Sequence, residues 1–293
     1  MKPKKPFRIF LWGLLFTGLC VGAFLLYDRG RPVPVPMKQT LYEGVTYRRM
    51  IKISPRPMIV HIIVIDTKVE GVRFLVTPPD SSGDTPLNAR TTSQFLKEFG
   101  VQIAINGDGF SPWWSRSPVD YYPRPGDPVA PWGFSASGGD VYSQGVLERV
   151  GEAPTLYISR RNDLSFNRRP GSVFHAISGD RMLLEKGEIV EGLDNSALEP
   201  RSALGTNRNG RILYLIVVDG RQPFYSEGVT FMELAQLLKD QGAHFAMALD
   251  GGGSSTLVVE GEEGEPVILN SPIDNYIPGR ERPVGNHLGI FIK

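Results

Sequence analysis

The first hydrophobic stretch of the chain predicts a helix that crosses a membrane. Residues 7–27 are apolar apart from Arg8, and a helix needs roughly 20 such residues to span a bilayer. Three lysines precede this stretch, whereas only Arg29 and Arg31 follow it closely. The bias favours a cytoplasmic tail over residues 1–6, an anchor over residues 7–27, and a domain outside the cytoplasm, at the cell surface or in the periplasm.

A cleavable signal peptide is the alternative interpretation of the same stretch. The stretch is longer than the apolar part of a typical signal peptide, and no small-residue cleavage site follows it. Both interpretations send the domain to the same compartment. Residues 31–36 read RPVPVP, which favours an extended, stiff conformation. We therefore expect a spacer over residues 28–40 and one globular domain over residues 41–293.

Beyond the spacer, the pattern predicts many strands and two helices. Thr91 with Gln94, and Thr230 with Glu233, have the spacing of helix capping boxes, and each pair is followed by an apolar helical face and then a glycine. We expect an α+β fold: a mixed, largely antiparallel sheet with two principal helices, in a single domain behind the transmembrane helix. The expected strands, rich in β-branched residues, are 59–65, 72–76, 101–105, 155–159, 173–177, 212–218, 245–249, 255–259 and 288–292.

Each predicted helix is followed by a strand and then by a glycine-rich turn. The turns read AINGDG at residues 104–109 and ALDGGG at residues 248–253. This indicates a helix, strand and turn unit used twice, although two common units can also coincide by chance. Both turns lie at strand ends, where sheets tend to place ligand sites.

Residues 111–134 show no strand periodicity and are rich in proline and aromatic residues. Loops of this length are usually functional or disordered, and the aromatic content argues against disorder. Such a loop could pack down as a lid or offer flat apolar faces to a sugar ring. Its large aromatics are Trp113, Trp114, Tyr121, Tyr122 and Trp132.

Composition narrows the class of protein. The one cysteine, Cys20, lies in the predicted anchor, so the domain cannot contain a disulfide within the chain. The first 40 residues hold seven of the 32 Lys and Arg and one of the 31 Asp and Glu, which leaves a mildly acidic domain. Such a domain lacks the basic face of a nucleic-acid binder, so we expect no nucleic-acid partner.

The strongest local motif is LDGGGSST at residues 249–256. Three glycines let backbone N–H groups approach a ligand closely, and Asp250 would stand at the strand end. Hydroxyls of the following residues could bind a phosphate or a sugar. A tight turn explains the glycines almost as well. The segment lacks the lysine of a P-loop, the following helix of a dinucleotide site and the pattern of an esterase elbow.

Arginines stand next to three further predicted strands or turns. The motifs are VDGRQ at residues 218–222, PRSALG at residues 200–205 and ERP at residues 281–283. Arginine suits bidentate capture of a phosphate or carboxylate, although any one arginine is more often solvated or ion-paired. The four histidines are scattered, without a zinc-protease motif, and each reads as structural.

In this order, the motifs resemble those of the phosphodiester glycosidase family, bacterial relatives of the lysosomal enzyme that uncovers mannose 6-phosphate by removing N-acetylglucosamine. The resemblance covers roughly residues 60–293, through VHIIVID, AINGDGF, PRSALGTN, VVDGRQ, ALDGGGSSTLVV, LNSPIDN and ERPVGNHLGIFI. Where the family usually reads N-G-G-F-F, this chain has Asn106-Gly107-Asp108-Gly109-Phe110, so Asp108 adds a carboxylate.

The resemblance implies hydrolysis of a sugar 1-phosphodiester in a glycan or glycoconjugate outside the cytoplasm, such as a teichoic acid, capsular polymer or exopolysaccharide intermediate. A carboxylate would act at the anomeric carbon or on water, and cationic groups would hold the departing phosphate. The catalytic candidates are Asp250 and Asp219. The candidates for substrate and phosphate binding are Asn106, Asp108, Arg201, Asp219, Arg221, Gly251, Gly252, Gly253, Ser254, Ser255 and Arg282.

Two other classes remain open from the sequence. A membrane-tethered, non-catalytic glycan-binding protein of envelope or exopolysaccharide metabolism would keep the fold and the aromatic loop. A metal-dependent hydrolase could use the oxygen ligands of Asn106, Asp108, Asp219 and Asp250 for Ca²⁺ or Mg²⁺. The reaction itself calls for no cofactor, and we expect none.

Overall fold

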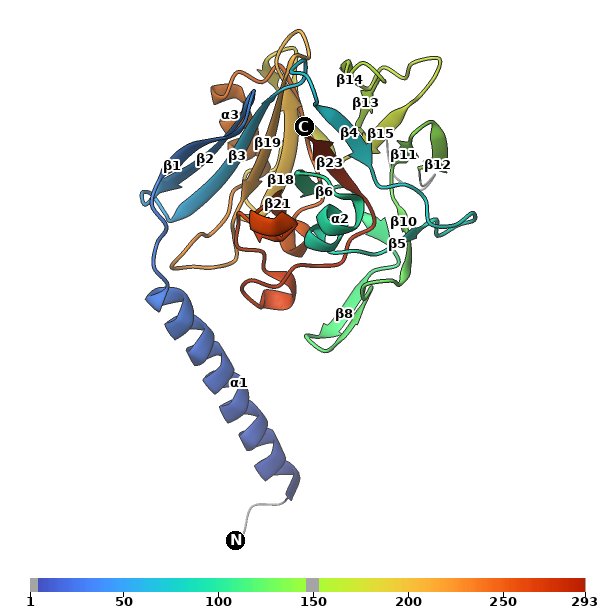
Figure 1. The fold of residues 1–293 in the computed structure, drawn as a ribbon. Helices are drawn as coiled ribbons and strands as arrows, with labels where there is room; N and C mark the ends of the chain where they lie inside the picture. The colour runs from blue at the N-terminus through green and yellow to red at the C-terminus, as the bar shows by residue number, and fades with distance from the viewer. Residues whose placement is uncertain (1–4, 146–152, 293) are drawn as a thin grey trace.

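The computed structural model describes residues 5–145 and 153–292. Within these residues the domain is built on two facing sheets, with a helix on the outer side of each (Figure 1). The larger sheet has eight strands, in the order β1 (Met37–Tyr42), β2 (Val45–Lys52), β3 (Met58–Asp66), β19 (Ile212–Val218), β18 (Arg201–Thr206), β20 (Phe245–Ala248), β16 (Arg181–Glu185) and β17 (Glu188–Ile189).

Two five-stranded sheets complete the main architecture. The one that faces the large sheet has the order β22 (Pro266–Ile268), β21 (Leu257–Glu260), β6 (Ile103–Asn106), β23 (His287–Phe291) and β4 (Arg73–Val76). The other has the order β12 (Asp140–Gln144), β11 (Phe134–Ser137), β15 (His175–Ser178), β13 (Thr155–Ile158) and β14 (Leu164–Phe166).

Smaller elements lie between these sheets. Three short strands pair as β5 (Leu87–Asn88), β10 (Pro128–Pro131) and β7 (Phe110–Ser111), and β8 (Trp114–Ser117) pairs with β9 (Asp120–Tyr122) as a hairpin. Single 3₁₀ turns are η1 (Gly252–Ser254), η2 (Glu262–Gly264) and η3 (Asp274–Tyr276).

Alternation along the central strands explains the layers. On β3, Ile63 and Ile65 enter the core between the sheets, whereas Val60 and Ile62 point to the outer face. That outer face is covered by α3 (Phe231–Asp240) through its leucines. A strand buried on both faces must be apolar throughout, which is why β3 and β19 read as continuous hydrophobic runs.

The second helix, α2 (Thr92–Phe99), covers the smaller facing sheet with Phe95 and Leu96. Both predicted capping boxes are present, because the Thr91 and Thr230 hydroxyls accept from the N–H groups three residues on and the Gln94 and Glu233 side chains bond back. The predicted α+β fold, with a largely antiparallel sheet and two principal helices, is confirmed for the described residues of the domain.

All nine predicted strands are found, with ends that differ by one or two residues. The expectation for residues 111–134 is wrong in part, because the hairpin β8–β9 and the strand β10 lie there. Aromatic residues stabilise this hairpin: the Trp114 and Tyr122 rings stack with centroids 6.3 Å apart. Cross-strand stacking of this kind stabilises a short hairpin that shows no apolar periodicity.

Helix α1 (Lys5–Gly30) projects from the domain (Figure 1). Residues Phe10–Gly30 are long and apolar enough to cross a membrane. The helix extends past the predicted anchor to Gly30, and β1 begins at Met37, inside the predicted spacer. The spacer between the helix and the sheet is therefore shorter in this structure than residues 28–40.

Candidate active site

The two glycine turns meet where the facing sheets end. The N–H of Asp250 donates to the carbonyl oxygen of Gly107 at 2.9 Å. The Asn106 side chain donates to the carbonyl oxygen of Asp250 at 2.8 Å and accepts from Ser202 Oγ at 2.7 Å. It also accepts from the N–H of Thr256 at 3.2 Å. One buried carboxamide thus joins the two turns.

A pocket of about 580 Å³ opens beside the second turn. Asp250, Gly251 and Gly252 line it, together with Arg201, Arg221 and Arg282 from the three predicted arginine motifs. These motifs are separated by up to 81 positions in the chain, and the strand order of the large sheet brings the first two together. The structure therefore unites the glycine turn with all three arginines in one cavity.

Each glycine of the turn faces one arginine. A Cβ atom would lie 3.6 Å from Arg201 Cδ at Gly251, and only 2.9 Å from Arg221 Nη2 at Gly252. At Gly253 it would lie 2.5 Å from Arg282 Nη2. Contacts under 3 Å are closer than a real Cβ tolerates. Glycine is therefore needed at 252 and 253 so that Arg221 and Arg282 can pack against the backbone, whereas at Gly251 the tightest neighbour is the carbonyl oxygen of Pro200, at 3.0 Å.

The three arginines are held differently. Arg221 Nε donates to Glu199 at 2.6 Å, and Arg282 Nε donates to Asp274 at 2.7 Å. These carboxylates fix the direction of two guanidinium groups.

Arg201 pairs with no carboxylate among the described residues. Its guanidinium carbon lies 3.6 Å from the centroid of the Phe231 ring, and its Nε is 3.5 Å from the carbonyl oxygen of Val229. Burial lowers the pKa of Arg201, because the low-dielectric surroundings disfavour its charge. An anion in the pocket would relieve that cost.

Asp250 is partly exposed to the pocket, but protein atoms enclose its carboxylate on most sides. Burial therefore raises the pKa of Asp250, and the negative charge of Asp180 adds to the rise. A hydrogen bond from Ser254 and the charge of Arg282 act in the opposite direction without cancelling it. A carboxylate with a raised pKa is a stronger base than an ordinary one, which suits proton transfer.

Several pocket residues were missed by the sequence analysis. These include Asp180 and Arg181, at the start of β16, and Glu199, before β18. No long apolar run predicts a strand at either place. Arg181 Nε donates to Asp180 at 2.7 Å. The adjacent acid and base after the predicted strand 173–177 were the available signal. Aromatic side chains also line the cavity, from Trp113, Trp132, Phe231 and Tyr276.

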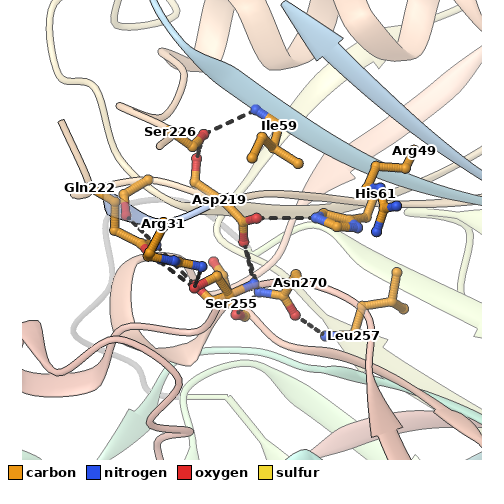
Figure 2. A network of polar contacts seen from close by, with 12 residues as sticks. Arg31, Arg49, Ile59, His61, Asp219, Gln222, Ser226, Ser255, Leu257 and Asn270 are labelled. Carbon is orange, nitrogen blue, oxygen red and sulfur yellow. Dashed lines mark hydrogen bonds and ion pairs between the residues drawn. The ribbon is translucent and has the colours of Figure 1, made fainter. Parts of the chain in front are cut away.

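Asp219 lies in the protein interior, 1% exposed, and does not line the pocket (Figure 2). Its carboxylate accepts from the N–H of Ser271 at 2.6 Å and lies 3.1 Å from Nε2 of His61. The other ring nitrogen of His61 is 2.9 Å from the Tyr47 hydroxyl. Burial raises the pKa of Tyr47 to about 12, so it remains a neutral hydrogen-bonding group. The predicted direct role of Asp219 does not fit this geometry.

Asp108 and Asn106 are also fully buried. The Asp108 carboxylate accepts from the N–H groups of Gly109, at 2.7 Å, and Gly133, at 2.5 Å. It thereby joins the two ends of the aromatic loop. The predicted contacts of Asn106 and Asp108 with sugar hydroxyls are not supported by their positions, because neither side chain reaches the pocket.

The backbone of the glycine turn is largely occupied within the fold. The N–H of Gly252 donates to Pro200 O at 2.8 Å, and those of Ser254 and Ser255 donate back to the turn at 3.2 Å. Ser254 and Ser255 are buried, and Ser254 Oγ accepts from Arg282 Nη1 at 3.3 Å. Gly253 and Ser254 therefore pack against Arg282, and neither they nor Ser255 line the pocket, so the predicted contact of these three residues with the phosphate is not supported.

The oxygen ligands considered for Ca²⁺ or Mg²⁺ do not converge. Asp108 and Asp219 already bind buried N–H groups in separate places, and Asp250 lies in the pocket. Among the described residues, no group of three or more His, Cys, Asp or Glu side chains could hold a metal ion.

Comparison with known proteins identifies the family. The sequence model of the phosphodiester glycosidase family matches residues 99–291, which include both turns and all three arginine motifs. The chain belongs to the phosphodiester glycosidase family. This confirms the predicted family.

Two curated relatives match parts of this chain. Mouse N-acetylglucosamine-1-phosphodiester alpha-N-acetylglucosaminidase is 27% identical over 141 residues, which are 43% of this chain and 27% of the mouse protein. The prophage-derived protein YomE of Bacillus subtilis is 36% identical over 103 residues, which are 35% of this chain and 14% of YomE. The chain therefore matches well under a third of either relative's length.

Solved structures support the fold of this chain. The zebrafish N-acetylglucosamine-1-phosphodiester alpha-N-acetylglucosaminidase catalytic domain, auto-inhibited by its pro-peptide, gives a TM-score of 0.60 at 22% identity, covering 90% of this chain and 86% of that one. A hypothetical protein from Synechocystis gives 0.57 at 15% identity, covering 89% of this chain and 64% of that one. At these identities the comparison concerns the fold alone.

Proposed function

We propose that the pocket hydrolyses a sugar 1-phosphodiester and releases a free sugar and a phosphomonoester. The observation that carries this proposal is the convergence of Asp250, with its raised pKa, and three arginines around one glycine turn. The mouse relative is named for cleavage of an N-acetylglucosamine 1-phosphodiester. An N-acetylated hexose is accordingly the first sugar to test.

Charge divides the roles in the pocket. Cleavage moves the electron pair of the anomeric C–O bond onto a phosphate oxygen, so negative charge grows on the leaving group. Arg201, Arg221 and Arg282 would bind that charge, and Arg201 is the one without a carboxylate partner among the described residues. A phosphate ester leaves without prior protonation, so a strong general acid is not required.

The carboxylates would serve the sugar side of the reaction. Asp250 would take a proton from the water that attacks the anomeric carbon, for which its raised pKa is suited. Asp180 lies on the same pocket and would stabilise positive charge on the ring. Asp219 would not touch the substrate and would act only by positioning Arg221. Its buried hydrogen bonds hold the end of β19, from which the chain continues to Arg221.

Aromatic rings would hold the sugar. Trp113 and Trp132 are 49% and 40% exposed and line the same pocket as Asp250. Flat apolar faces of this kind pack against the C–H faces of sugar rings.

We also propose that α1 is a single N-terminal membrane span and that the domain lies outside the cytoplasm. The segment Phe10–Gly30 supports the span, and the positive charges before it support the orientation.

The test uses the full-length protein in detergent micelles. N-acetylglucosamine 1-phosphodiesters of short alcohols are supplied with and without a chelator, and free reducing sugar is followed over time. We expect release that survives chelation and that is lost in Asp250→Asn. Asp163→Asn is the matched control, because its carboxylate is 68% exposed and pairs with a surface lysine.

Two outcomes would overturn parts of this assignment. Normal turnover by folded Asp250→Asn would remove Asp250 from the reaction. Tight glycan binding without release from any sugar phosphodiester would favour the membrane-tethered glycan-binding protein instead.

A further inference from the structure

The last turn of α1 is bound to the domain. Asp28 lies in this helix, and its Oδ2 accepts from the N–H of Phe224 at 2.7 Å. Arg31 lies over the Tyr225 ring, 3.5 Å from its centroid, and donates to Ser271 Oγ at 3.1 Å. Arg31 also donates to Gln222, as Figure 2 shows.

These contacts begin inside the helix that is apolar enough to span a membrane. No length of free chain therefore separates the span from its first contacts with the domain. The domain must lie directly on the surface of the membrane that contains α1. Its orientation on that surface is set by the junction, because Asp28 is bonded to Phe224 in the loop after β19 and Arg31 to Ser271 after β22.

The end of the domain from which α1 leaves also carries the hairpin β8–β9 (Figure 1). The hairpin presents Trp114 and Val119, which are 38% and 79% exposed, and the neighbouring turn η3 presents Tyr276 and Ile277, at 67% and 38%. The two parts are in contact, because Arg280 Nη1 donates to the carbonyl oxygen of Pro118 at 2.7 Å. We call these exposed side chains of the hairpin and of residues 276–277 the rim.

Arginines are interleaved with the aromatic residues of the rim. Arg116 lies 4.9 Å from the Trp114 ring centroid and is 78% exposed, with only a loose pairing of 3.9 Å to Asp120. Arg124 and Arg280 both lie over the Tyr121 ring, at 5.6 and 4.3 Å. Exposed aromatics with cations between them are typical of a membrane interface, where rings sit at the headgroup level and cations meet anionic lipid.

The hairpin and η3, which carry the rim, also form part of the pocket wall. Trp113 and Ser115, from the hairpin and the residue before it, line the pocket on one side, and Asn275 and Tyr276 line it from η3. The Ser115 hydroxyl donates to the Asn275 side chain. The rim therefore adjoins the pocket along the side that the hairpin and η3 form.

We propose that the rim rests on the phospholipid bilayer and that the pocket takes its sugar 1-phosphodiester from a lipid alcohol embedded in that bilayer. The substrate class rests on the proposed function, whereas the contact of the rim with the bilayer does not. The phosphate reaches the arginines while the lipid chain remains in the membrane.

The first experiment tests the surface without any activity. The full-length protein, with Cys20→Ser in α1, carries Val119→Cys labelled with an environment-sensitive dye, in vesicles of anionic phospholipid. Val141→Cys on β12, also exposed and away from α1, is the matched control. We expect a blue shift of the dye at position 119 and none at position 141. Equal spectra at both positions would overturn the contact of the rim with the membrane.

The second experiment tests the substrate class in proteoliposomes. N-acetylglucosamine 1-phosphate is esterified either to a long-chain lipid alcohol in the same bilayer or to methanol in solution. Confinement with the anchored enzyme should favour the lipid diester by on the order of 100-fold in turnover at equal total concentration. Val119→Ser with Ile277→Ser should lower only the lipid reaction, by roughly tenfold, because two apolar contacts with the bilayer are lost and neither residue lines the pocket. Val141→Ser should change neither.

The outcomes separate the two proposals. Equal hydrolysis of both diesters, or an equal loss of both in the rim variant, would overturn the lipid substrate and leave the glycosidase function standing. Failure to hydrolyse either diester would overturn the proposed function, and the dye spectra would still decide whether the rim lies on the membrane.

Discussion

Replacing Gly253 with alanine places one methyl group against Arg282. The new Cβ would lie 2.5 Å from Nη2, so the guanidinium must retreat by about 0.9 Å to reach an ordinary contact of 3.4 Å. Arg282 cannot move freely, because Asp274 holds its Nε at 2.7 Å and Ser254 accepts from its Nη1. The methyl also approaches Asp274 Oδ1 at 3.0 Å, so the ion pair itself is disturbed.

A displacement near 1 Å of a group that binds the transition state costs on the order of 100-fold in rate, or about 2.7 kcal/mol of transition-state stabilisation. Overpacking of the buried turn should lower the free energy of unfolding by about 1–3 kcal/mol. We therefore expect folded Gly253→Ala to retain roughly 1% of wild-type kcat/KM for a sugar 1-phosphodiester.

The assay is reducing-sugar release under initial-rate conditions, paired with urea unfolding of the same preparation. Gly171→Ala is the matched control, because a Cβ at Gly171 meets no atom within 4 Å. If Gly253→Ala is folded and its kcat/KM equals that of wild type, the position of Arg282 is not important for catalysis and the assignment of phosphate binding to it is wrong.

Three further predictions concern buried ionisable groups. Burial raises the pKa of Asp250, so the neutral carboxyl contributes stability below its unfolded pKa, and this contribution is lost as pH rises through its folded pKa. Asp250→Asn should therefore raise Tm near pH 7, with a smaller gain near pH 4. Scanning fluorimetry measures both values. Asp219→Ala leaves the N–H of Ser271 and the ring of His61 without their acceptor and should cost at least roughly 2 kcal/mol in urea unfolding; a stable but inactive variant would restore Asp219 to the reaction. Burial lowers the pKa of His175 to about 4, so about 3 kcal/mol of stability should be lost as pH falls from about 6.5 to 4. His175→Asn should flatten that part of the plot of unfolding free energy against pH. An unchanged slope would show that protonation of His175 does not cause the loss.

Local sequence signals predicted the elements well. The capping boxes of Thr91 and Thr230 join residues three apart, so their geometry is determined by the segment itself. Central strands such as β3 are buried on both faces, and their continuous apolar runs identify them without tertiary information. β16 and β18 lack a continuous run of this kind, because β16 has only Met182, Leu183 and Leu184 between charged ends and β18 reads RSALGT.

The site was harder to predict, and the two aspartates show why. Asp219 and Asp250 both follow an apolar strand and precede a glycine. Asp219 lies in the interior, where it is bonded to Ser271 and His61, which are 52 and 158 positions away in the chain. Asp250 faces a pocket whose other wall comes from residues before β18 and in the aromatic loop. The neighbours that distinguish them are distant in the chain, so the local pattern could not separate a supporting carboxylate from a reactive one.

The Asn106 side chain also has a consequence for how activity is acquired. Its three hydrogen bonds reach Ser202 and Asp250 from the large sheet and Thr256 from the smaller one. Neither sheet alone can place Asp250, since two of these partners belong to the large sheet, whereas Thr256 and Asn106 itself belong to the smaller one. Enzymatic activity recovered during refolding should therefore appear only when the sheets have docked, later than the circular dichroism signal of the strands. A refolding time course that follows both signals would use this one amide as a reporter of assembly.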